Sequence, residues 1–179
     1  MTCLLAPSVA FAIVPAIVPA AVPADPPAVA TSSASAFALA GTWVLEAADD
    51  LHPDGTRTPG YGLHPQGLLL IDPDGRYSLQ IFRDDRPKFA AGDKRKGTPE
   101  EFSAAVLGMS SHIGRLSLDS AAGIVTFQIE AASFPNWDAT EQKRHYTLEG
   151  DRFSYQVPAN AASAGGSGNI PISVWRRVR

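Results

Sequence analysis

Histidines, one arginine and several tyrosines are the side chains of this sequence that could do chemistry. His112 and His145 fall on two different strand-like segments, so they could meet inside a folded sheet. None of the four histidines shows metal-ligand spacing, and the single cysteine, Cys3, lies near the N terminus. We therefore predict no metal site and no cofactor, and we expect each strand histidine to be a hydrogen-bonded or solvated side chain.

Arg144 belongs to the alternating segment Glu141–Leu148 and shares its parity with Tyr146 and Leu148. Successive side chains of a strand point to opposite faces, so Arg144 faces inward if Tyr146 and Leu148 do. A buried arginine without an acidic partner is costly unless a bound anion satisfies it. The segment thus predicts either an arginine that binds the anionic group of a ligand or one that reaches water near the open end of the fold.

Acidic residues occur in adjacent pairs, at Asp49–Asp50, Asp84–Asp85 and Glu100–Glu101. Neighbouring residues of a strand face opposite sides, so these pairs are poor candidates for an acid–base dyad. The sequence also lacks a G-x-S-x-G nucleophile motif, a phosphate-binding loop and a dinucleotide fingerprint. We predict no catalytic residue from these patterns.

The elements that must position these side chains belong to one ordinary globular domain. The chain has 179 residues, of which 45% are hydrophobic and 18% charged, with a formal net charge of -3. This length and composition suffice for one domain with one core. No basic stripe of the kind that nucleic-acid binders need is present, so we predict no nucleic-acid partner.

Residues 1–36 differ from the rest because Ala, Pro, Val and Ser dominate them. Several prolines interrupt the apolar run, so we predict no stable membrane span. Ala34-Ser35-Ala36 forms an A-x-A cleavage site, although the basic n-region of a signal peptide is missing. We interpret residues 1–36 as a signal peptide, with a disordered Ala/Pro-rich leader as the alternative. The mature domain is then residues 37–179, in a secreted or periplasmic protein.

Alternating apolar residues predict an antiparallel β-protein. The clearest hairpin joins Leu68–Asp72 to Arg76–Phe82 through the turn Pro73–Gly75. The other predicted strands are one opening at Gly41, then Ser111–Asp119, Ile124–Ala131, Glu141–Leu148, Arg152–Val157 and Asn169–Val178. About eight strands at this short spacing favour a closed up-and-down barrel or a sandwich, and such a barrel leaves room for side chains or one small ligand.

Two loops and one helix complete the expected elements. Leu51–Gly67 and Pro158–Gly168 are rich in turn residues and predict loops. Gly97–Met109 predicts the only convincing helix, because Thr98 and Glu101 form a capping box around Pro99. The apolar residues that share one helical face are Phe102, Ala105, Val106 and Met109. We expect this helix to lie against a sheet or to plug the end of a barrel.

The segment Ser133–Asp138 places a proline and two aromatic residues between two predicted strands. Pro135 lacks a backbone donor and forces the chain out of the strand ladder. Phe134 and Trp137 can then fold over the end of a barrel or into its cavity. They form either a hydrophobic plug that completes the core or an aromatic wall for a ligand.

Five segments together resemble the bacterial and fungal lipocalin-like domain family, over nearly all of residues 41–179. They are Gly41–Ala47, Pro65–Phe89, Gly97–Glu101, Ser133–Phe153 and Val174–Arg177. The resemblance implies an all-β fold, a small antiparallel up-and-down β-barrel of about eight strands with one short α-helix and an interior cavity. It implies no shared catalytic site.

Gly41-x-Trp43 on the first strand, with an arginine near the end of the last, also resembles the wider lipocalin group. In that group the arginine covers the tryptophan at the closed end of the barrel, and here the match is Arg176 or Arg177. A guanidinium over an indole gains cation–π energy, so the implied role is structural.

The leading hypothesis is a non-catalytic module that binds a small hydrophobic molecule in its barrel. The alternatives are an isomerase or cyclase that uses Tyr, His or Arg as acid–base groups, and a structural domain with a filled barrel. The candidate ligand-binding residues are Tyr77, Leu79, Ile81, Phe127, Phe134, Trp137, Arg144, Tyr146 and Tyr155.

Overall fold

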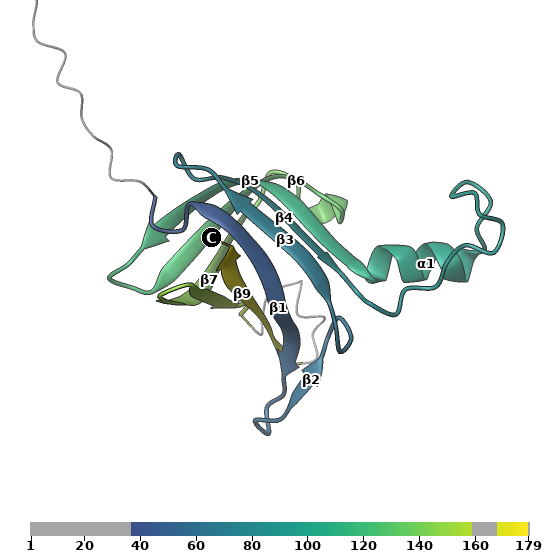
Figure 1. Ribbon diagram of the computed structural model, residues 1–179, viewed down its shortest axis with the longest axis horizontal. Helices are drawn as coiled ribbons and strands as arrows, with labels where there is room; N and C mark the ends of the chain where they lie inside the picture. Colours follow the sequence, from purple (N-terminus) through teal and green to yellow (C-terminus); the bar gives the residue numbers. More distant parts are fainter. Residues whose placement is uncertain (1–36, 159–167, 179) are drawn as a thin grey trace, which may run out of the picture. The chain divides into compact units, whose positions relative to one another are not determined.

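A computed structural model describes residues 37–158 and 168–178 of the protein, which form one antiparallel sheet and one α-helix (Figure 1). The predicted leader, with Cys3 and Ala34-Ser35-Ala36, lies outside the described residues, as does most of the Pro158–Gly168 loop. The elements are β1 (Gly41–Leu51), β2 (Arg57–Pro59), β3 (Gln66–Ile71), β4 (Arg76–Phe82), α1 (Pro99–Leu107), β5 (Met109–Asp119), β6 (Ile124–Ala132), the 3-10 helix η1 (Pro135–Trp137), β7 (Glu141–Glu149), β8 (Arg152–Gln156) and β9 (Ile170–Val178).

The sheet closes on itself because its last strand pairs with its first. From β3 to β9, consecutive strands pair with each other, and β1 pairs with β3 on one side and with β9 on the other. The β1–β9 ladder runs from Thr42↔Val178 to Leu51↔Ile170. The result is the predicted closed antiparallel barrel of eight strands with one short helix, to which β2 adds a short ninth strand.

The period-two alternation of the sequence determines which side chains fill the barrel. In β4, Tyr77, Leu79 and Ile81 are buried, whereas Arg76 before them and Gln80 between Leu79 and Ile81 are exposed. The same alternation holds in β6 from Val125 to Ile129. Such strands contribute one row of side chains to a common core, as expected for antiparallel strands with one face toward solvent.

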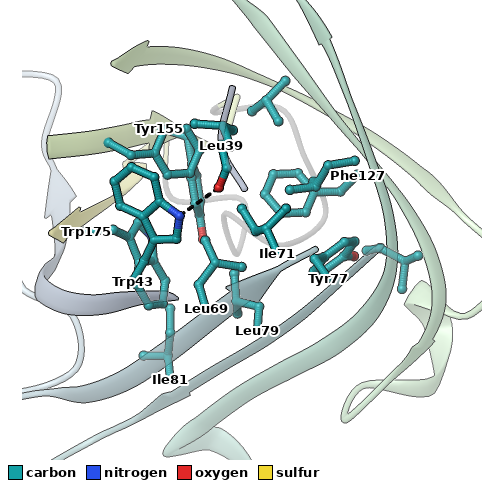
Figure 2. Close-up of a cluster of buried hydrophobic side chains, with 14 of the residues drawn as sticks. Leu39, Trp43, Leu69, Ile71, Tyr77, Leu79, Ile81, Phe127, Tyr155 and Trp175 are labelled. Carbon is teal, nitrogen blue, oxygen red and sulfur yellow. Dashed lines mark hydrogen bonds between the residues drawn. The ribbon is translucent and has the colours of Figure 1, made fainter. Parts of the chain in front are cut away.

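The core includes Trp43, which is fully buried near the start of β1 (Figure 2). Its indole Nε1 donates a 2.9 Å hydrogen bond to the carbonyl of Leu39. The guanidinium carbon of Arg177 lies 4.2 Å from the centroid of the Trp43 ring, and Arg177 also donates to the carbonyl of Ala40. These contacts seal one end of the barrel, which we term the closed end.

Of the two arginines near the end of β9, only Arg177 lies over the indole. Arg176 points outward and forms an ion pair of 3.2 Å with Glu46 on β1. Gly41 allows the close approach of Arg177, because a Cβ atom at Gly41 would lie 3.1 Å from the Arg177 Nη1. Gly41 also has a φ of +137°, a conformation that favours glycine.

Helix α1 begins where the sequence predicts, with both hydrogen bonds of the Thr98–Glu101 capping box present. The expectation that it lies against the sheet or plugs the barrel is wrong, because no residue of α1 is buried. Val106 is 57% exposed, and Phe102 makes an edge contact with Phe89 in the preceding loop instead of with the core. The hydrophobic core is built from side chains outside α1, so the helix does not contribute to it.

The long predicted loop after β1 contains an additional strand. β2 pairs with Asp49, Asp50 and Leu51 at the end of β1, whereas β3 pairs with Gly41–Val44 at its beginning. A β-bulge in the β1–β9 ladder, between Leu45 and Ala47, separates the two halves. β1 is therefore split between two partners along one of its edges.

Candidate functional site

A cavity of about 290 Å³ lies inside the barrel, along the halves of β1 and β9 farther from the closed end. The lining side chains divide by their burial into a floor and a mouth. The buried floor residues include Ile81, His112, Arg144, Tyr155 and Ile172. The more exposed mouth residues include Asp49, Asp50, Tyr61, Leu107, Asn169 and Pro171.

Arg144 reaches the floor from β7, where it pairs in register with Val125 of β6. Its side chain is almost fully buried, at 4% exposure. The guanidinium carbon lies 4.2 Å from the ring centroid of Phe127 and 4.9 Å from that of Tyr155. Two aromatic faces therefore hold the guanidinium in place, with one hydrogen bond of 2.6 Å from its Nη2 to Gln142.

The charge of Arg144 has no acidic partner among residues 37–158 and 168–178. Its Nε is buried and makes no hydrogen bond to the described residues. Burial lowers the pKa of Arg144, and the nearby Tyr155 and Tyr77 act in the opposite direction. A buried cation with an unused donor is costly alone, so a hydrogen-bond acceptor or anion bound in the cavity would be stabilised strongly.

His112 lies beside Arg144 and is held by Tyr77 of the neighbouring strand. The Tyr77 hydroxyl is 2.7 Å from Nδ1 of His112, and both side chains are buried. Burial, followed by the positive charge of Arg144, lowers the pKa of His112 to about 3. Burial likewise raises the pKa of Tyr77. Both groups are therefore neutral near pH 7, and neither has a pKa suited to proton transfer there.

The Tyr77 contact also determines what His112 offers to a ligand. A phenol is the stronger donor and an imidazole nitrogen the stronger acceptor, so we assign the hydrogen bond as Tyr77 O–H donating to Nδ1. The neutral ring then carries its proton on Nε2. The His112 Nε2–H and the guanidinium of Arg144 are therefore the hydrogen-bond donors that the floor offers to a ligand. His145 does not join this group, because it is exposed on the outer face of β7.

The two aromatic residues between β6 and β7 differ, because Trp137 lines the cavity and Phe134 does not. Pro135 begins the one-turn helix η1, so the chain leaves the ladder there. Trp137 is half-buried, lines the cavity and makes an edge contact with His112, at 6.1 Å between ring centroids. Phe134 packs edge-on against Trp137 at 5.6 Å but is 43% exposed and does not line the cavity.

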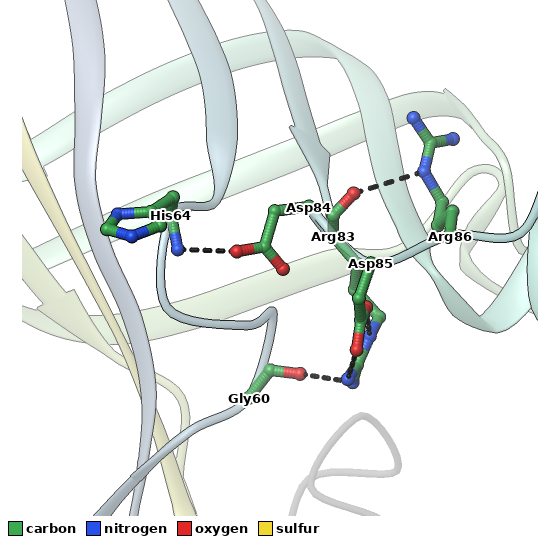
Figure 3. Close-up of polar contacts among 6 residues, drawn as sticks. All are labelled: Gly60, His64, Arg83, Asp84, Asp85 and Arg86. Atoms are coloured by element: carbon green, nitrogen blue, oxygen red, sulfur yellow. Dashed lines mark hydrogen bonds and ion pairs between the residues drawn. The ribbon is translucent and has the colours of Figure 1, made fainter.

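Tyr61 reaches the mouth from the loop between β2 and β3, which is fixed to the segment after β4 (Figure 3). Nη1 of Arg83 donates to the carbonyl of Gly60 at 2.8 Å. On the other side of Tyr61, the backbone N–H of His64 donates to the Asp84 carboxylate at 2.7 Å. The two hydrogen bonds bracket Tyr61 and hold its loop at the edge of the cavity.

Gly62 makes this arrangement sterically possible. It has a φ of +85°, and a Cβ atom there would lie 1.8 Å from Oδ1 of Asp84. The acidic pair Asp84–Asp85 therefore has divided roles, since Asp84 holds the loop while Asp85 forms a 2.8 Å ion pair with Arg83. Burial raises the pKa of Tyr61, and its hydroxyl is neutral near pH 7.

The structure brings together some of the predicted site residues and separates others. Four of them line the cavity: Ile81, Trp137, Arg144 and Tyr155. Four others pack in or against the core beside it: Tyr77, Leu79, Phe127 and Tyr146. Sequence reasoning did not assign to the site the polar lining residues Asp49, Asp50, Tyr61, Ser110, His112, Asn169 and Ser173. A sequence signal exists for the acidic pair Asp49–Asp50 and for His112 on its strand-like segment, but neither signal indicates a cavity.

Two further properties concern the whole described part of the chain. Within residues 37–158 and 168–178, no group of three or more His, Cys, Asp or Glu side chains could hold a metal ion. Over the same ranges, no helix has the length and apolar character needed to cross a membrane.

Comparison with known proteins agrees with this geometry. The 4′-hydroxy-3′-methoxypropiophenone carrier protein of Aspergillus oryzae is 29% identical over 80 residues, which cover 41% of this chain and 72% of that protein. No solved structure matches the chain significantly. Residues 40–178 match the model of the lipocalin-like domain family. The protein therefore belongs to the lipocalin-like domain family.

Proposed function

We propose that the barrel binds and carries a small, mostly apolar molecule whose single acceptor or anionic group is held by Arg144. The observation that carries this proposal is the guanidinium itself, which is buried at the floor of a cavity with no acidic partner among the described residues and an unused Nε donor. Such a group is stabilised when a ligand oxygen enters the cavity.

The size and walls of the cavity fit an aromatic ligand. A volume of about 290 Å³ lies near the lower end of typical ligand pockets, which suits a molecule built on one ring. Trp137 and Tyr155 offer ring faces or edges to such a molecule. The fungal relative is named as the carrier of an aryl ketone, which combines an aromatic ring with a carbonyl acceptor.

Two observations weigh against the other hypotheses. The cavity argues against a barrel filled only by its own side chains. The directions of the pKa shifts argue against an isomerase or cyclase that uses the Tyr77–His112 pair. Burial lowers the pKa of His112, which makes it a weak base, and raises the pKa of Tyr77, which makes it a weak acid. A pair that donates hydrogen bonds without changing its protonation suits binding better than proton transfer.

Titration calorimetry with two matched probes tests the proposal. The first is 4′-hydroxy-3′-methoxypropiophenone, and the second is the same molecule with CH₂ in place of its carbonyl. We expect the ketone to bind about tenfold or more tightly, because a hydrogen bond to a charged donor is worth about 1.5–3 kcal/mol.

Variants identify the donor. Arg144→Met keeps an apolar stem and should abolish the preference for the ketone, whereas the outward-facing Arg176→Met should retain it. Equal affinity of the parent protein for the two probes, or an unchanged preference in Arg144→Met, would contradict the proposal.

A further inference from the structure

We propose that the two ends of the cavity carry opposite charges, with Arg144 at the floor and Asp50 at the mouth. A ligand is thereby oriented with its acceptor group at the floor and its hydrogen-bond donor at the mouth, where the Asp50 carboxylate accepts the hydrogen bond. This inference rests on the proposed function and specifies its ligand class. The class is a one-ring aromatic molecule with a carbonyl or carboxylate at one end and a phenolic hydroxyl at the other.

The floor supplies donors and positive charge. Arg144 contributes a guanidinium with an unused Nε, and His112 contributes a neutral ring whose Nδ1 is occupied by Tyr77. Among the described residues, no acidic side chain lines the floor. A ligand hydroxyl would find cationic and N–H donors there in place of a strong acceptor, whereas a carbonyl or carboxylate would find its complement.

The mouth supplies the opposite charge through Asp50. Ala48 on the same strand is buried, and side chains two residues apart share a face, so Asp50 lies on the cavity side; Asp49 between them also belongs to the lining of the mouth. The carboxylate lies against the Tyr61 loop, because a Cβ atom at Gly60 would be 3.1 Å from its Oδ2. Within the described part of the chain, no basic side chain forms an ion pair with Asp50.

Asp50 is thus the acidic counterpart of Arg144, since each is a charged side chain that lines the cavity without an ion-pair partner among the described residues. It is a half-buried carboxylate that lines the cavity, and its charge acts on the neighbouring hydroxyl of Tyr61. A carboxylate accepts hydrogen bonds only, and those from a phenolic O–H to an ionised acceptor are among the strong ones. The Tyr61 hydroxyl, held by its bracketed loop, provides a second polar group beside it.

Strand geometry gives the spacing between the two polar points. Ser173 pairs with both Ala48 and Tyr155, so Ala48 is level with the ring beside which Arg144 stacks. Asp50 lies two residues further along β1, which is roughly 7 Å nearer the mouth. This spacing along the strand places the two charged groups at different depths of the cavity, with Asp50 nearer the mouth than Arg144.

The test measures selectivity for the donor end of the ligand. The probes are 4′-hydroxypropiophenone and 4′-methoxypropiophenone, which share the ketone and differ in whether they can donate a hydrogen bond. We expect the parent protein to prefer the hydroxyl compound about tenfold or more. Asp50→Leu should remove that preference, while Glu46→Leu, at an exposed carboxylate of the same strand that does not line the cavity, should keep it.

The outcomes separate this inference from the function on which it rests. If both probes bind with dependence on Arg144 but Asp50→Leu keeps the preference for the hydroxyl, the orientation is wrong and the carrier function stands. If neither probe binds the parent protein, both proposals are overturned. Should Asp50→Leu fail to fold, Asp50→Asn is the second variant, because it keeps the shape but replaces the charged acceptor with a weaker neutral one. We expect a diminished preference there, and an undiminished preference would refute the assignment.

Discussion

The hydroxyl of Tyr77 and Nδ1 of His112 lie 2.7 Å apart beneath the cavity floor, so that two buried polar side chains satisfy each other. They come from neighbouring strands, β4 and β5, and both also make edge contacts with the ring of Phe127. The pair allows a polar ring to form part of the floor without an unpaired Nδ1 in the core.

Removing this hydroxyl should destabilise the fold. In Tyr77→Phe, Nδ1 of His112 stays buried without its partner, and we expect the free energy of unfolding to fall by about 1–3 kcal/mol. Urea denaturation measures this change. Tyr146→Phe is the control, since the Tyr146 hydroxyl makes only an exposed 3.5 Å contact with Ser120 and its loss should change stability by less than about 0.5 kcal/mol. Equal effects of the two substitutions would show that the buried contact contributes little.

His112 should make stability depend on pH below neutrality. Its pKa is about 3 in the folded protein and has its ordinary value of 6.5 in the unfolded chain. Between these values the unfolded chain binds more protons, so the folded state loses stability as pH falls from 6.5 toward 3. The slope from this group is at most about 1.4 kcal/mol per pH unit.

Denaturation at pH 7 and pH 5 isolates this contribution from those of the carboxylates. Relative to the parent protein, His112→Gln should gain stability between pH 7 and pH 5, because glutamine does not titrate there. His145→Gln is the matched control, since that side chain is exposed, and it should track the parent. A difference between the parent and His112→Gln that stays constant over this range would disprove the buried neutral state.

The two neighbouring arginines of β9 should differ in their contribution to stability. Arg177→Met loses the ring contact with Trp43 and the hydrogen bonds to the carbonyls of Ala38 and Ala40, so we expect a loss of about 2 kcal/mol or more. Arg176→Met loses an exposed ion pair with Glu46, which is worth less than about 1 kcal/mol. Thermal unfolding of both variants measures the contrast, and similar shifts in the midpoint would show that the closed end needs no cation.

Much of the fold could be predicted because the alternation of apolar and polar residues is visible within the sequence of a single strand. The β3–β4 hairpin follows from the turn Pro73–Gly75 and from the period-two pattern of Tyr77, Leu79 and Ile81. The capping box of α1 was equally local. What α1 packs against was not local, because it depends on which apolar surfaces the assembled strands leave uncovered.

The candidate site likewise has features that follow from local sequence patterns and features that depend on contacts between distant residues. The inward direction of Arg144 could be inferred from the parity of β7, but its lack of a counter-ion depends on which residues the other strands place around it. The contact of His112 with Tyr77 joins residues 35 positions apart, a separation that no local pattern reports. Asp50 was hidden by the β-bulge between Leu45 and Ala47, which lets both Trp43 and Ala48 face inward although their parity differs.

The split pairing of β1 has a consequence for how this protein can change. Gly41–Val44 pairs with β3 and belongs to the seal around Trp43, whereas Asp49–Leu51 pairs with β2 and belongs to the rim. One strand thus belongs to the closed end with its first residues and to the rim of the cavity with its last. On the proposed function, we expect substitutions or grafts between Leu51 and Pro65 to alter ligand preference without loosening the seal, which would make the chain a scaffold for engineering small-molecule carriers.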